Sequence, residues 1–105
     1  MIAAKEAGIS VELIDLRTIY PIDRETIKQS VGKTGRFLVV TEAPGSFGAA
    51  AELISVVTEE AFLSLEAPPT RLAGFDTIPP LPKGEHLYFH SPERIFHEIK
   101  KLCDY

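Results

Sequence analysis

The sequence has only one cysteine, Cys103, among its 105 residues, so it cannot form an internal disulfide bond. It has no cluster of basic residues longer than Lys100-Lys101, and its net charge is −4. Because a nucleic-acid surface concentrates positive charge, we expect no nucleic-acid partner. No apolar run approaches the roughly 20 residues that a membrane-spanning helix requires, so we expect no membrane association. These absences predict a protein of a reducing, intracellular compartment.

The composition predicts one folded domain. Hydrophobic residues make up 45% of the chain and charged residues 25%, which is ordinary for a globular protein and argues against disorder. A chain of this length can bury a single, modest core. We therefore treat residues 1–105 as one domain.

The stretch from Arg36 to Leu53 organises the chain. Residues 36–42 form a short, β-branched apolar run, which predicts a buried strand. Residues 43–48 interrupt it with Pro44 and two glycines, and an alanine-rich helix is predicted from 49 to about 63. Strand, tight turn and helix in that order are typical of a parallel α/β sheet.

Shorter patterns predict the other elements. A strand is expected wherever apolar residues alternate or run together, and a helix wherever a capping residue precedes an apolar stripe. The predicted elements are a short helix ending before Gly8, a strand over 10–14, a helix from Arg24 to about Val31 capped by Asp23, a strand over 70–75, brief pairing at 87–89, and a final helix that begins after Ser91.

One turn has the residue types of an anion site. Gly45, Ser46 and Gly48 precede a helix, where backbone amides can bind phosphate. The turn lacks the lysine and the spacing of a P-loop, so a structural turn is favoured over a weak anion site. A stand-alone phosphate- or nucleotide-binding module that uses this turn stays open as the alternative function.

Candidate metal ligands and nucleophiles are weaker. His86, His90, Glu93 and His97 offer nitrogen and oxygen ligands, but their spacing matches no metal motif. Cys103 is followed by Asp104, whose charge disfavours a thiolate. We therefore predict no metal site and no catalytic residue in this chain, although a metal-binding domain built on the histidines remains a rival.

Several collinear motifs resemble one family. They are residues 11–23, Lys33-Thr34-Gly35-Arg36, Thr41-Glu42-Ala43-Pro44, 59–62, 65–68, 71–77 and 102–105. They are similar to the C-terminal domain of transketolase-like enzymes. More narrowly, they resemble the beta subunit of thiamine-diphosphate-dependent 2-oxoacid dehydrogenases, with the branched-chain type nearest and the pyruvate type next.

The resemblance implies a three-layer α/β/α sandwich with a mostly parallel sheet. Members of the family have a further strand and a glycine turn before the helix that begins here at Met1. We therefore expect the chain to lack the first strand of its sheet and to be a fragment of a longer beta subunit. Exposed ladder groups at the open edge would then favour self-association of the fragment.

The resemblance also implies a function without catalysis in this domain. The parent enzyme oxidatively decarboxylates a 2-oxoacid, with thiamine diphosphate and magnesium bound outside these residues. The domain would join the alpha subunit and a second beta subunit in an α2β2 assembly, and would dock the basic subunit-binding domain of a dihydrolipoamide acyltransferase. Glu98, Asp104 and the carboxylate of Tyr105 are the nominated docking groups. The expected location is the prokaryotic cytoplasm, or the mitochondrial matrix in a eukaryote.

Overall fold

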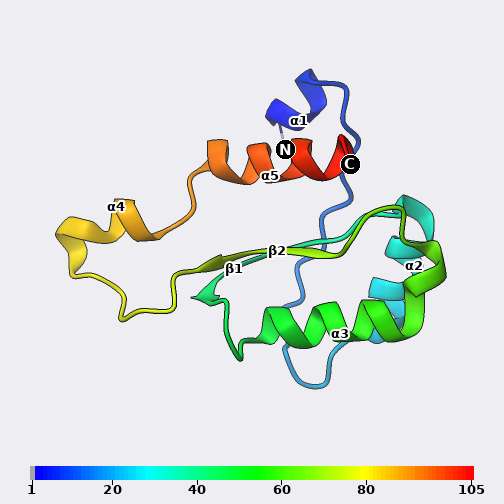
Figure 1. The fold of residues 1–105 in the computed structure, drawn as a ribbon, viewed down its shortest axis with the longest axis horizontal. Helices are drawn as coiled ribbons and strands as arrows, with labels where there is room; N and C mark the ends of the chain where they lie inside the picture. Colours follow the sequence, from blue (N-terminus) through cyan, green and yellow to red (C-terminus); the bar gives the residue numbers. More distant parts are fainter. Residues whose placement is uncertain (1) are drawn as a thin grey trace.

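The computed structural model describes residues 2–105, which form an α/β fold around a two-stranded parallel sheet. The elements are α1 (Ile2–Glu6), α2 (Arg24–Thr34), β1 (Leu38–Pro44), α3 (Ala49–Ala61), β2 (Thr70–Gly74), α4 (Glu85–Tyr88) and α5 (Pro92–Cys103). Figure 1 shows three layers, with α1 and α5 on one face of the sheet and α2 and α3 on the other. The predicted fold class is confirmed.

The predicted strand, turn and helix lie in the centre of the fold. Strand β1 pairs with β2 in parallel, with Leu38 opposite Thr70 and Val40 opposite Leu72. Parallel neighbours need a crossover connection, and α3 supplies it. The carboxyl ends of both strands therefore lie at the same edge of the sheet.

The main core lies between α2, α3 and β1. Its buried side chains are Ile27, Val31, Leu53, Val57 and Ala61, and Phe37 and Val39 pack against them. Helix α2 begins as predicted, because the Asp23 carboxylate accepts a hydrogen bond from the Thr26 amide at 3.1 Å. It ends three residues later than predicted, at Thr34. Gly35, at φ +70°, provides the left-handed cap, whereas Gly32 lies within the helix.

The predicted strand over residues 10–14 is wrong. Within residues 2–105, this segment has no strand assignment and no ladder partner, and the Leu13 side chain is 76% exposed. Figure 1 shows it crossing from the layer of α1 to the layer of α3 instead of running beside β1. Alternation of apolar residues predicts a strand only where a neighbouring strand can complete the hydrogen bonds.

The predicted pairing at residues 87–89 is also wrong, because residues 85–88 form the short helix α4. The helical turn buries the Tyr88 ring at 4% exposure while Leu87 stays exposed. The last helix, α5, is confirmed: Ser91 caps it by accepting a hydrogen bond from the Arg94 amide at 3.2 Å. Helix α5 packs against α1, β1 and β2, and so forms the helical layer opposite α2 and α3.

Candidate partner-docking surface and glycine turn

The nominated docking residues lie at the end of α5. A cavity of about 140 Å³ opens there between the last turns of α5 and the start of β2. Its lining residues are Pro68, Thr70, Glu98, Lys101, Leu102 and Tyr105. The structure thus brings Glu98 and Tyr105 together, while the exposed Asp104 lies outside the lining. Because Lys101 shares the cavity, its charge is mixed.

Packing of α5 fixes the orientation of this surface. Leu102 is 9% exposed and belongs to the apolar stripe of the helix, which contacts both strands. Glu98 is half-buried, and the Tyr105 side chain is 77% exposed. An apolar floor with a carboxylate and an exposed aromatic ring at its rim is typical of a protein-binding surface.

Arg36 contacts the same region, although no pattern in the sequence marked it as part of a site. Its Nε–H donates to the Leu102 carbonyl oxygen at 3.2 Å, and its Nη1 donates to Glu66 Oε2 at 2.6 Å. The residue lies two positions before β1, so only the folded chain brings it to the end of α5.

The glycine turn already holds a carboxylate of its own chain. The Ser46 amide donates to Asp76 Oδ1 at 3.1 Å, and the Ser46 hydroxyl donates to Asp76 Oδ2. The hydroxyl bond first, and then the amide bond, hold the pKa of Asp76 below its ordinary value. Asp76 therefore already occupies the two Ser46 donors, and its negative charge would repel an anion at this turn.

Parallel pairing explains this contact. Ser46 follows β1 by two residues and Asp76 follows β2 by two, so both lie where the strands leave the same edge of the sheet. The sequence pointed to Ser46 through its glycines, but not to Asp76. The spacing of both residues after predicted parallel strands was the signal that could have found it.

His90 contacts strand β1 through one ring nitrogen. Its Nε2 lies 2.8 Å from the Thr41 carbonyl oxygen, which can only accept, so Nε2 carries the proton and donates. Its Nδ1 is buried and has no hydrogen-bond partner among residues 2–105. Across residues 2–105, no group of three His, Cys, Asp or Glu side chains is placed to hold a metal ion.

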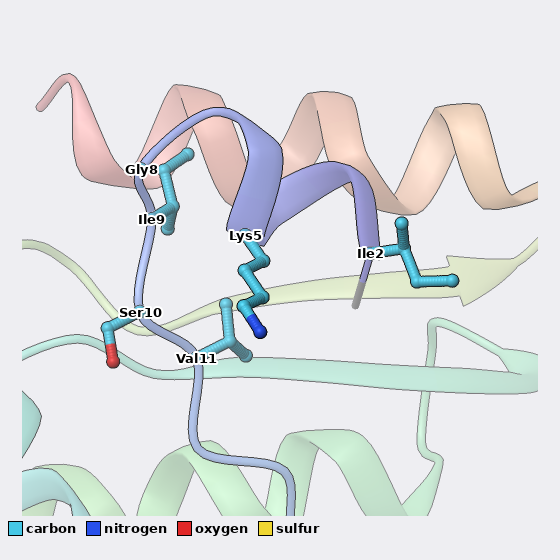
Figure 2. A pocket seen from close by; sticks show the side chains of 6 residues that line it. All are labelled: Ile2, Lys5, Gly8, Ile9, Ser10 and Val11. Atoms are coloured by element: carbon cyan, nitrogen blue, oxygen red, sulfur yellow. The ribbon is translucent and has the colours of Figure 1, made fainter.

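A larger cavity lies between α1 and the segment that follows it. It measures about 550 Å³ and is lined by Ile2, Lys5, Gly8, Ile9, Ser10 and Val11. Figure 2 shows the Lys5 and Val11 side chains pointing toward one another across it. Among the lining residues that the structure describes, Lys5 is the one charged residue, and no carboxylate, histidine or thiol accompanies it. This cavity therefore lacks a pair of groups that could transfer a proton.

None of the helices described over residues 2–105 is long and apolar enough to span a membrane. A parallel sheet between two helical layers, with strand ends that hold a glycine turn, defines the class of protein: an α/β domain. The chain belongs to the family of the transketolase C-terminal domain, which matches residues 2–95.

Similar proteins are dehydrogenase beta subunits. The chain is 62% identical over 96 residues to the pyruvate dehydrogenase E1 component subunit beta of Acholeplasma laidlawii, covering 91% of this chain and 29% of that protein. It is 51% identical to the same subunit of Mycoplasma pneumoniae, covering 93% and 29%. It is 45% identical to the 2-oxoisovalerate dehydrogenase subunit beta of Pseudomonas aeruginosa, covering 97% and 29%. The chain thus spans about three tenths of the length of these relatives, and the two pyruvate subunits share the higher identities among the three.

Proposed function

We propose that this chain serves as the C-terminal domain of a 2-oxoacid dehydrogenase beta subunit and works as part of a longer polypeptide. The observation that carries the proposal is the 62% identity across 91% of the chain to a pyruvate dehydrogenase beta subunit. The match covers only 29% of that protein, so most of the parent activity would depend on residues outside this domain.

The domain's role in the parent enzyme would be assembly with an alpha subunit and a second beta subunit. The parent would use thiamine diphosphate and magnesium for oxidative decarboxylation. The glycine turn does not fit the diphosphate, because Asp76 accepts the Ser46 hydrogen bonds. No three metal-ligating side chains converge within residues 2–105. We therefore derive no catalytic step for these residues.

Docking of a dihydrolipoamide acyltransferase would use the end of α5. Glu98 and Tyr105 border one cavity, and Asp104 lies beside Tyr105 in the sequence. Carboxylates on an exposed rim attract a basic partner and speed its encounter, while apolar contacts with Leu102 and Pro68 would add short-range affinity. The subunit-binding domain of the acyltransferase is the proposed occupant.

Charge-neutralising variants test this docking site. Glu98→Gln and Asp104→Asn should each weaken binding of the basic subunit-binding domain by about 1.5- to 5-fold at low salt, because exposed ion pairs contribute modestly. Glu85→Gln on α4, at the other end of the molecule in Figure 1, removes the same charge and serves as the matched control. Equal losses in all three variants, measured by titration calorimetry, would contradict a site at α5.

A further inference from the structure

We infer that Arg36 is a positioning residue that sets the spacing between the two walls of the cavity at the end of α5. The inference rests on the proposed docking function, because it names the residue that holds the docking surface in shape. It concerns a side chain that lies outside the cavity lining.

The cavity has one wall from each of two separate segments. Glu98, Lys101 and Leu102 come from α5, and Tyr105 follows that helix. Pro68 and Thr70 come from the segment that enters β2. The two walls come from segments that are far apart along the chain, so the distance between them depends on tertiary contacts.

Arg36 bonds to one wall and to the segment that leads into the other. Its Nε–H reaches the carbonyl of Leu102, which itself lines the cavity. Its Nη1 reaches Glu66, two residues before Pro68. Glu66 is held in turn by its backbone, because its amide donates to the Gly35 carbonyl oxygen at 2.8 Å. A shift of the α5 wall would therefore strain the bond to Leu102, and a shift of residues 66–70 would strain the bond to Glu66.

The chemistry of the guanidinium suits this role. The carbonyls of the last helical turn lack intrahelical donors, and positive charge is favourable at a helix C-terminus. A planar guanidinium can donate to two acceptors in different directions, whereas a lysine ammonium cannot copy that geometry. The Arg36 side chain is 31% exposed, whereas its Glu66 partner is 63% exposed, so salt should weaken the bond to Glu66 more than the part-buried bond to the Leu102 carbonyl.

Arg24 provides a matched comparison. Its Nη1 lies 2.8 Å from Glu60 Oε1, and its side chain is 47% exposed, so it makes a similar arginine–glutamate pair. It lies at the start of α2 and lines neither wall of the cavity. Removing either arginine makes the chain more acidic by one charge, which alone should strengthen binding of a basic partner.

The experiment compares Arg36→Ala, Arg36→Lys and Arg24→Ala. We expect Arg36→Ala to weaken binding of the basic subunit-binding domain about 3- to 10-fold, against the direction of its charge change. Arg36→Lys should not restore affinity, although it restores the charge. Arg24→Ala should bind at least as tightly as the wild type. Hydrogen exchange should accelerate in Arg36→Ala at the amides of Glu66, Ala67 and Thr70 and at residues 100–105, and in Arg24→Ala at neither segment.

Two results would overturn the inference: Arg36→Ala binding like Arg24→Ala, or full rescue by Arg36→Lys. If the wild-type chain binds no subunit-binding domain, the proposed docking function fails, and hydrogen exchange still decides the role of Arg36. Faster exchange at both walls in Arg36→Ala then supports it, and unchanged exchange at either wall overturns it.

Discussion

The carboxylate of Asp76 is a single group that joins two loops. Both oxygens accept hydrogen bonds from Ser46, and these bonds lower the pKa of Asp76 below its ordinary value of 3.8. A group whose pKa is lower in the folded state stabilises that state above the unfolded pKa and loses this contribution as pH falls through the folded pKa. The contact should therefore stabilise the fold near neutral pH and weaken under strongly acidic conditions.

Asp76→Asn tests this pH dependence. We expect the variant to melt at a lower temperature than the wild type at pH 7, and the difference to shrink as the pH falls below about 4. Glu85→Gln is the control, because the exposed Glu85 carboxylate makes no hydrogen bond or ion pair within residues 2–105. Thermal melts followed by circular dichroism supply the measurement. A difference that stays constant with pH would contradict the assignment.

Substitution by alanine should change the free energy of unfolding in opposite directions at two glycines. A Cβ on Gly74 would overlap the Glu42 carbonyl oxygen and lie 2.7 Å from the Tyr88 hydroxyl, so Gly74→Ala should destabilise by about 1–3 kcal/mol. A Cβ on Gly32 would meet nothing within 4 Å inside α2, so Gly32→Ala should stabilise by about 0.5–1 kcal/mol. Chemical denaturation measures both. A Gly74→Ala variant at least as stable as the wild type would contradict the close packing around Gly74, and a destabilised Gly32→Ala variant would contradict the open space at Gly32.

At the scale of elements, the main core is formed by side chains of α2 and α3 that pack against each other. Ile27 is 2% exposed and packs in the cluster with Leu53 and Val57. Ile27→Ala should cost about 2–5 kcal/mol, because it removes buried methyl groups and leaves a cavity. Leu63→Ala, at a position 96% exposed, should change stability by less than about 0.5 kcal/mol. Similar urea midpoints for the two variants would place the core elsewhere.

Elements defined by local signals could be predicted from the sequence. The Asp23 and Ser91 caps and the turn before α3 depend on neighbouring residues, and the structure confirms them. Strand β1 is present, but it begins two residues later than predicted, continues to Pro44, and is half-buried to exposed instead of buried. Residues 10–14 and 87–89 could not be predicted this way, since strand formation depends on a partner that sequence alternation does not supply. In the second case, burial of Tyr88 outweighed the β propensity of an aromatic run.

Across the whole molecule, the candidate surfaces lie at opposite ends of the sheet. The glycine turn follows the carboxyl end of β1, and the α5 cavity lies beside the start of β2. Glu98 and Tyr105 were nominated from a family resemblance, which cannot show a cavity. The cavity and the contacts of Arg36 can be recognised only in the folded structure, because they join distant segments. Arg36 and Leu102, for example, are 66 positions apart.

Participation of this domain in a 2-oxoacid dehydrogenase assembly, as proposed above, can be tested by binding. The most direct test titrates the folded chain with a dehydrogenase alpha subunit and with the acyltransferase's basic subunit-binding domain, at ionic strengths of about 0.01 M and about 1 M. We predict binding to at least one partner, and weaker binding of the basic domain at high salt. Binding to neither partner, by a chain shown to be folded by circular dichroism, would contradict the claim.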